Sequence, residues 1–226
     1  GVNGTDVGVR YLNTISTEVE LDHAELYPDS VAEGSTPGID AVREAAEGTL
    51  GLTIQYYVQV DMQGFVELVD ALGGVTINSS GRYPINGALD DDGNIILEEG
   101  WIEPGVQVMN GYTALWYARS RYTTDDYDRM ARQREVQEAL LRQFDPATVL
   151  SKFEAIAAAG TTAVKTDIPQ GMVGTFVSLA SKSRDFELVS IDMVPPLIDP
   201  EYPDFAYLQQ LVREALPVAT AEPVEG

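Results

Sequence analysis

Residues 54–78 read IQYYVQVDMQGFVELVDALGGVTIN and decide the fold class. The first eight residues are rich in β-branched and aromatic side chains, which is typical of a β-strand. Apolar residues then recur at helical spacing as far as the glycine pair at 73–74, and Val75–Asn78 is a second short strand. This strand–helix–strand order predicts an α/β protein in which helices cover a sheet.

Turn residues and apolar spacing place the neighbouring elements. The capping hydroxyl of Thr36 and the proline at position 37 predict a helix that ends within Gly48–Gly51. Its expected apolar face holds Ile39, Val42, Ala46 and Leu50. Residues 1–35 are polar and turn-rich, so we expect an irregular lead-in there with one strand near Val7–Leu12.

The rest of the chain alternates short strands and helices. Asp90–Asn94 lacks the spacing and closing glutamate of an EF-hand, which favours a solvated turn over a calcium site. No repeat or linker divides the sequence, so one domain over residues 1–226 is predicted. We expect extended segments at 95–97, 101–109 and 186–191, and helices at 110–115, 124–144, 147–158, 169–182 and 205–216.

Composition excludes several classes of chemistry. The 226 residues are 44% apolar, enough for a globular core, and they include no cysteine and a single histidine. Disulfides, thiolate metal sites and histidine-rich metal sites are therefore excluded. Fourteen basic against 36 acidic side chains give a formal charge of -22, which opposes nucleic-acid binding. No apolar run approaches the ~20 residues of a membrane span, so membrane attachment would need an N-terminal anchor outside this chain.

Five of the eleven arginines fall within sixteen positions, and this concentration is the strongest candidate for a site. If residues 117–122 are extended, Arg119 and Arg121 share one face. On the following helix Arg129, Arg132 and Gln133 share another face. Guanidinium groups bind phosphate oxygens bidentately and stay charged, so this pattern is suited to a pyrophosphate.

The N-terminal end of that helix adds to the same attraction, because its dipole and free amides favour an anion. Asp125, Asp126 and Asp128 lie among the arginines. Two alternatives stay open for these carboxylates: they pair with the arginines in structural ion pairs, or they hold a divalent cation on the phosphate oxygens. A salt-bridged helix start without any ligand is the simpler interpretation.

Two stretches together resemble the LytR-CpsA-Psr family. Residues 56–75, YYVQVDMQGFVELVDALGGV, are similar to its central segment. Residues 111–121, GYTALWYARSR, followed by DYDRMARQ at 126–133, resemble its second signature. The match covers about residues 36–145, and the helices and closing strand of 146–226 fit more loosely. The resemblance implies a mixed central β-sheet between helices, a three-layer α/β arrangement.

The resemblance also implies a function. The family transfers anionic glycopolymers from a polyprenyl-pyrophosphate carrier to peptidoglycan, outside the cytoplasm at the cell envelope, with the help of Mg²⁺. Arg119 and Arg121 resemble its arginine pair, and Asp126 occupies a commonly acidic position, which makes these three the expected catalytic residues and Asp126 the expected metal ligand. The expected pyrophosphate contacts are Arg119, Arg121, Arg129, Arg132, Gln133 and, as a distorted motif with Asn13, Arg10.

A lipid pocket belongs to this expectation. Its predicted lining is Phe65, Val69, Val136, Leu140 and Phe153, although helical apolar spacing is equally typical of an ordinary core. Residues 1–35 do not match the proline-arginine-aspartate motif of the family. The alternative function is therefore a non-catalytic envelope module, for binding or for a structural or filament role, on the same scaffold.

Overall fold

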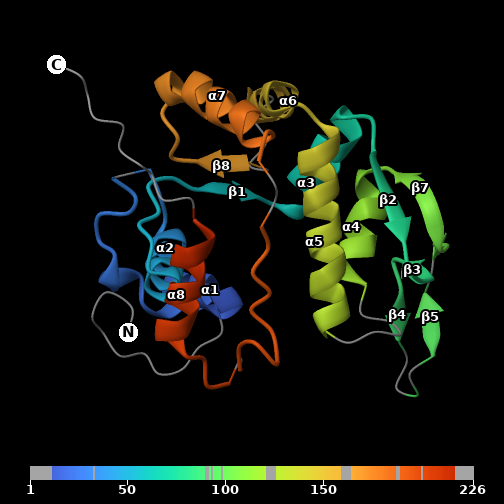
Figure 1. Cartoon of the computed structure of the whole chain (residues 1–226), viewed down its shortest axis with the longest axis horizontal. Coiled ribbons are helices and arrows are strands. Elements are labelled where there is room, and N and C mark those ends of the chain that lie inside the picture. The colour runs from blue at the N-terminus through green and yellow to red at the C-terminus, as the bar shows by residue number, and fades with distance from the viewer. Residues whose placement is uncertain are drawn as a thin grey trace. The chain divides into compact units, whose positions relative to one another are not determined.

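The computed structural model describes residues 12–32, 34–89, 92, 94–97, 99–120, 126–158, 164–186, 189–199 and 201–216. Their contacts divide the chain into two compact units, residues 1–57 with 188–226 and residues 58–187 (Figure 1). Each unit has its own buried apolar clusters. The single domain over residues 1–226 stays a prediction.

The first unit is built from helices. They are α1 (Leu12–Asp22), the short η1 (Ala24–Leu26), α2 (Pro37–Leu50) and α8 (Phe205–Ala215). α2 begins as predicted, because Thr36 accepts a hydrogen bond from the amide of Ile39, and it ends at Gly51, whose φ of 67° is the left-handed cap that glycine allows. Within the predicted irregular lead-in, residues 12–22 form the helix α1 instead. The predicted strand near Val7–Leu12 lies outside the described residues except for Leu12, which is helical.

The buried face of α2 differs from the prediction. The buried residues are Pro37, Gly38, Asp40 and Ala41, whereas the predicted apolar face is only partly buried. Helix α1 causes the difference, because it packs on α2 so closely that a Cβ at Gly38 would lie 2.8 Å from the hydroxyl of Ser16. Asp40 is accommodated by hydrogen bonds from Ser35 and Arg43.

The strands found among the described residues lie in the second unit and form four antiparallel pairs. The strands are β1 (Val58–Val60), β2 (Val75–Ser79), β3 (Tyr83–Ile85), β4 (Ala88–Leu89), β5 (Ile95–Leu97), β6 (Gly100–Ile102), β7 (Gly105–Met109) and β8 (Val164–Thr166). The pairs are β1–β8, β2–β7, β3–β6 and β4–β5. The predicted strand 54–61 is shortened to β1, and its partner β8 was not predicted. The described residues of 186–191 do not form the expected strand.

The helices of this unit follow the predicted order. They are α3 (Met62–Ala71), α4 (Gly111–Arg119), α5 (Asp126–Gln143), α6 (Pro146–Ala158), η2 (Gln170–Met172) and α7 (Val173–Ser183). α3 and α5 pack on α4, and α5 also packs on β2. None of the helices among the described residues has the length and apolar character that a membrane span requires.

The core of the second unit lies among α3, α4, α5 and the β2–β7 pair. Val75, Ile77 and Met109 point inward from the strands, and Tyr117 is fully buried on α4. Val69 and Val136, two of the predicted lipid contacts, belong to this core, and Phe65 and Leu140 pack against it. A lipid-lining role for these four residues stays a prediction. The side chain of Phe153 lies outside the described residues.

Candidate functional site

The N-terminal end of α4 is fixed on α3. Asn110 caps the helix, because its side-chain oxygen accepts a hydrogen bond from the amide of Thr113 at 2.8 Å. The amide of Gly111 donates to a carboxylate oxygen of Asp70 at 2.7 Å. Only glycine fits at position 111, since a Cβ there would lie 2.6 Å from the Cα of Val66. These contacts fix the N-terminal end of α4 at one position along the axis of α3.

The C-terminal end of α4 is fixed on α5. The last carbonyl groups of a helix have no partner within the helix. Here Arg132 donates from Nε to the carbonyl oxygen of Tyr117 at 2.9 Å and from Nη2 to that of Ser120. Gln133 donates to the carbonyl oxygen of Ala118 at 3.3 Å. Two neighbouring side chains of α5 thus satisfy three carbonyl groups around the end of α4.

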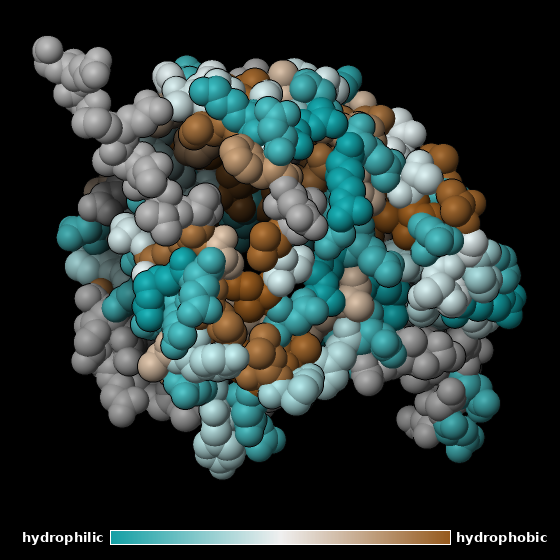
Figure 2. All heavy atoms as spheres, viewed as in Figure 1, coloured by the Kyte–Doolittle hydropathy of each residue, from teal (hydrophilic) through white to brown (hydrophobic). Residues whose placement is uncertain are grey.

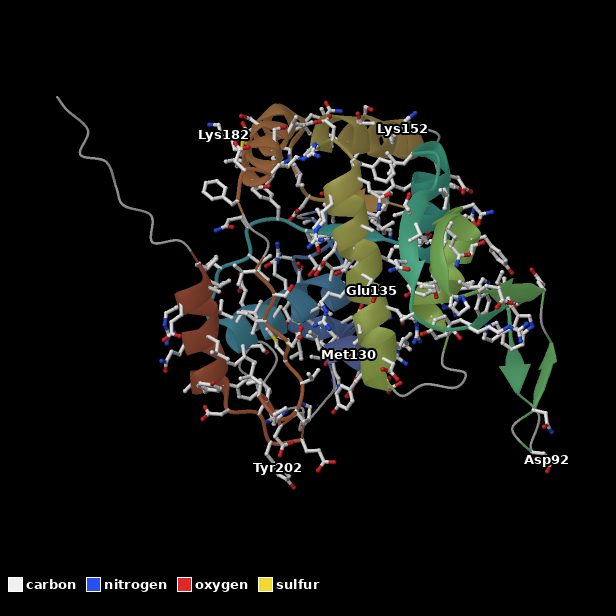
Figure 3. The ribbon with its side chains drawn as sticks, turned by 45° about the vertical axis from the view of Figure 1, so that its right-hand side comes forward. Asp92, Met130, Glu135, Lys152, Lys182 and Tyr202 are labelled. Atoms are coloured by element: carbon white, nitrogen blue, oxygen red, sulfur yellow. The ribbon has the colours of Figure 1, made fainter. Side chains whose placement is uncertain are left out.

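Tyr117 adds a side-chain link between the two helices. Its hydroxyl donates to a carboxylate oxygen of Glu135 on α5 at 2.5 Å, and its ring meets that of Tyr83 edge-on, with centroids 5.4 Å apart. Burial raises the pKa of Tyr117 above its ordinary value, and the hydrogen bond to Glu135 raises it further. Figure 3 labels Glu135 on α5. We call Tyr117, Arg132, Gln133 and Glu135 the α4–α5 junction.

Arg132 is placed differently from the surface arginine that the spacing predicts. Its side chain is 2% exposed, and its guanidinium carbon lies 4.4 Å from the centroid of the Tyr83 ring. The positive charge also meets the carbonyl end of α4, where the helix dipole favours a cation. The contacts described for Arg132 are thus to groups of the protein, and head-group binding by Arg132 stays a prediction.

Arg119 is the last residue of α4, so the assumed extended backbone is wrong up to this residue. Its side chain is exposed, and its guanidinium carbon lies 5.2 Å from the centroid of the Trp116 ring. Arg121 and Arg10 lie outside the described residues. Asn13 is the second residue of α1, but its side chain also lies outside them.

Arg129 and Asp126 form an ion pair in the first turn of α5. The guanidinium nitrogen Nη1 lies 2.7 Å from a carboxylate oxygen, and the Arg129 side chain is 19% exposed. The structure thus contains the ion pair of the first alternative, and the divalent cation of the second stays a prediction. Among the described residues, no three acidic or histidine side chains gather as a metal site. Figure 2 shows a band of hydrophilic side chains along α5.

The site residues are brought together in part. The junction joins the end of α4, which carries Arg119, to α5, one turn from Arg129. Sequence reasoning missed Tyr117, Glu135 and Tyr83. The signal for Tyr117 was its place in the quoted signature, two positions before Arg119. The signal for Glu135 was its spacing of three residues from Arg132, which places Glu135 and Arg132 on one face of a helix.

Comparison with known proteins gives consistent relatives. Over 154 residues, the chain is 34% identical to "Polyisoprenyl-teichoic acid--peptidoglycan teichoic acid transferase TagU" of Halalkalibacterium halodurans, covering 67% of this chain and 44% of that protein. It is 35% identical over 127 residues to "Biofilm regulatory protein A" of Streptococcus mutans, covering 53% of this chain and 29% of that protein. The chain therefore spans less than half the length of these curated relatives.

Solved structures share the fold. The crystal structure of B. subtilis TagV superposes with a TM-score of 0.59 at 22% identity, over 95% of this chain and 76% of that one. A Streptococcus agalactiae protein gives a TM-score of 0.51 at 30% identity, over 67% of this chain and 50% of that one. These likenesses confirm the predicted α/β class. The model of the LytR_cpsA_psr family matches residues 16–214. The chain therefore belongs to the LytR-CpsA-Psr family.

Proposed function

We propose that this chain provides the pyrophosphate-binding part of an envelope transferase, which moves an anionic glycopolymer from a polyprenyl-pyrophosphate carrier to peptidoglycan. Family membership and the transferase relative support this proposal. The observation that carries it is the placement of Arg119, an exposed arginine at the end of a helix that is fixed at both ends. A guanidinium held in this way is suited to an anion with several charged oxygens.

Arg119 and Arg129 are the two arginines among the described residues that we propose as head-group contacts. Arg129 stands in the first turn of α5, where the helix dipole also favours an anion. Its ion pair with Asp126 keeps the guanidinium at this end of the helix. Arg121, Gln133 and Arg10 complete the proposed contacts, with Arg121 following Arg119 by two positions.

The proposed reaction builds negative charge on a leaving group. A hydroxyl group of peptidoglycan attacks the glycopolymer at its bond to the carrier, and the electron pair of that bond leaves on the pyrophosphate oxygen. Arg119 and Arg121 would stabilise this developing charge by hydrogen bonds aimed at the oxygen, an effect worth about 3–4 kcal/mol for a well-placed donor. The attacking hydroxyl loses its proton to a base, and the carboxylate of Asp126 is the proposed acceptor of that proton.

Mg²⁺ belongs to the proposal as a counter-ion of the pyrophosphate. Magnesium binds through one or two carboxylates together with phosphate oxygens, so the carboxylate of Asp126 in the first turn of α5 matches its usual protein contribution. Asp128 lies two positions further along the helix and therefore faces another side. When bound, the ion would neutralise phosphate charge. Asp126 would hold the ion only by sharing its carboxylate with Arg129.

The test is the affinity for a soluble short-chain polyprenyl pyrophosphate, measured by calorimetry. Arg119→Ala is expected to weaken binding by about 10- to 100-fold, because a hydrogen bond to a charged group contributes about 1.5–3 kcal/mol. Arg142→Ala is the matched control. Arg142 is an exposed arginine in the last turn of α5, paired with Glu138, and its loss is expected to change the affinity less than twofold. Unchanged affinity in Arg119→Ala would refute the proposed site.

A binding module without catalysis is the second candidate. The observation in its favour is the ion pair of Asp126 with Arg129, which engages the proposed acidic residue with a partner within the protein. An assay of glycopolymer transfer to peptidoglycan in the presence of Mg²⁺ separates the two functions. Transfer by this chain, lost in Arg119→Ala, would establish the enzyme. Tight binding of the carrier without transfer would establish the binding module.

A further inference from the structure

We propose that Arg132 acts as a positioning residue: it fixes the end of α4 so that Arg119 meets the anion, and does not contact the anion itself. The inference rests on the proposed function of Arg119. It concerns a residue whose spacing alone predicts a direct contact, because Arg132 lies three positions after Arg129 on the same helix.

The first argument is burial. The guanidinium group of Arg132 donates to the carbonyl oxygens of Tyr117 and Ser120 and lies against the ring of Tyr83. With 2% of the residue exposed, it would have to break these contacts to reach a ligand at the surface. Such a movement would leave two buried carbonyl groups without their partner, at a high cost in free energy.

The second argument is the position of the bonded carbonyl groups. Tyr117 and Ala118 precede Arg119 in the chain, and Ser120 follows it. Arg132 therefore holds the backbone on both sides of Arg119, and Gln133 holds Ala118 between them. The hydroxyl of Tyr117 ties the same turn to Glu135. These four hydrogen bonds of the α4–α5 junction thus act within two residues of Arg119.

The third argument is the type of side chain. A guanidinium is a planar fork whose Nε and Nη2 donors point in fixed directions, so one arginine can hold two carbonyl groups a turn apart. A lysine carries the same charge on a single mobile ammonium group and cannot reproduce this geometry. Replacing Arg132 with lysine therefore keeps the positive charge at position 132 and removes the geometry of the two hydrogen bonds.

The consequence for function follows from the precision that anion binding requires. Displacement of a contact by about 1 Å can cost as much as 100-fold in a well-positioned site. If the end of α4 moves, Arg119 moves with it, because it is the last residue of that helix. The α4–α5 junction therefore sets the affinity of Arg119 for the pyrophosphate.

The first experiment compares charge with geometry in the affinity for a short-chain polyprenyl pyrophosphate. Arg132→Lys and Arg132→Met are expected to weaken binding alike, by about tenfold or more, since both lose the two carbonyl bonds. In an Arg119→Ala background the same changes are expected to add less than twofold, because the residue that they position is gone. Two results would show a direct contact and overturn the proposal. One is an unchanged affinity in Arg132→Lys. The other is a double variant whose fold loss in affinity equals the product of the losses in Arg119→Ala and in the Arg132 variant.

A second variant keeps the test decisive if the Arg132 variants do not fold. Glu135→Ala removes the acceptor of the Tyr117 hydroxyl from an exposed position of α5. Loss of a nearby negative charge would by itself strengthen anion binding, whereas loss of positioning weakens it. We expect a two- to fivefold weaker affinity that disappears in Arg119→Ala. Glu138→Ala, which removes a carboxylate one turn further along α5, is the control. Tighter binding in Glu135→Ala would overturn the proposal.

A spectroscopic readout separates this inference from the proposed function. Trp116 lies beneath the Arg119 guanidinium, and Trp101→Phe leaves Trp116 as the only tryptophan of the chain. Arg132→Lys is expected to shift the Trp116 emission without ligand, while Arg142→Met does not. Unchanged affinity in Arg119→Ala would refute the proposed function even when this shift is seen. Unchanged Trp116 emission in Arg132→Lys would refute the positioning role whatever the ligand.

Discussion

Gly111→Ala tests whether close packing of α4 on α3 holds the site in place. The added Cβ would lie 2.6 Å from the Cα of Val66, and closer still to the carbonyl oxygen of Val66. Both neighbours are backbone atoms of α3, so no side chain can rotate away to make room. The two helices must separate, and the hydrogen bond from the Gly111 amide to Asp70 lengthens as they do.

The expected cost follows from these contacts. Carbon atoms pack at about 3.5–4.0 Å, so α4 has to retreat by roughly 1 Å. Overpacking of this kind costs about 1–3 kcal/mol. A weakened hydrogen bond to the Asp70 carboxylate adds up to about 1.5–3 kcal/mol. The better helix propensity of alanine returns at most about 1 kcal/mol. We therefore expect Gly111→Ala to lower the free energy of unfolding by about 2–4 kcal/mol.

Urea unfolding monitored by tryptophan fluorescence is the appropriate assay. Both tryptophans, Trp101 and Trp116, lie in the second unit, so their emission follows the unit that contains α4. Gly174→Ala is the matched control, because Gly174 lies in the first turn of α7 with no atom within 4 Å of a Cβ there. This control is expected to be neutral or slightly stabilising. A Gly111→Ala protein within about 0.5 kcal/mol of the original, the size of an ordinary surface change, would refute the packing argument.

Three further perturbations test single interactions of the second unit. Burial raises the pKa of Tyr117, and the hydrogen bond to Glu135 raises it further. The folded protein therefore keeps a proton that the unfolded chain loses near pH 10. The free energy of unfolding is expected to have its full value below that pH and to fall above it. In Tyr117→Phe, the free energy of unfolding should decrease less above pH 10, as measured by urea unfolding with tryptophan fluorescence. An unchanged decrease would contradict the role of Tyr117. The side chain of Gln143 makes two hydrogen bonds to the backbone of Thr76 at the edge of β2. Gln143→Ala should therefore speed hydrogen exchange of the Thr76 amide at least tenfold, as measured by NMR. Exchange at the original rate would show that the side chain does not protect this edge. Asn110→Ala removes the N-cap of α4 and should cost about 1 kcal/mol in urea unfolding, while Asn78→Ala, an exposed position of β2, should cost less than half of that.

Elements whose ends are set by local chemistry were predictable from the sequence. Thr36 and Asn110 cap α2 and α4, and the glycine pair at 73–74 follows α3, each through contacts within a few residues. The order of helices from α2 to α8 was predictable for the same reason. Strand ends were not: β1 has only the three residues that pair with β8, more than a hundred positions away. Sequence spacing carries no information about such a partner.

In the candidate site, too, locally determined features were predictable, and features set by packing between helices were not. The concentration of arginines, and the helix that carries Arg129, Arg132 and Gln133, were visible in the sequence. The helical backbone at Arg119 was not, because its end is stabilised by α5 and not by a local cap. The buried face of α2 was missed in the same way, since α1 decides which side of that helix is covered.

Arginine spacing alone could not separate a ligand contact from a structural one, because both uses draw on the same donors. Binding of a phosphate and binding of helix-terminal carbonyl groups each require a charged planar fork. Burial distinguishes them, since Arg119 is exposed and Arg132 is enclosed. The distinction also bears on charge. α5 carries four acidic and four basic side chains, so this helix is neutral in a chain of formal charge -22. With charges screened over about 8 Å at physiological salt, an anion at this site experiences the local balance more than the total. The proposed role of Arg119 therefore depends on its position as well as on its charge, and the contacts that place it matter as much as the charge itself.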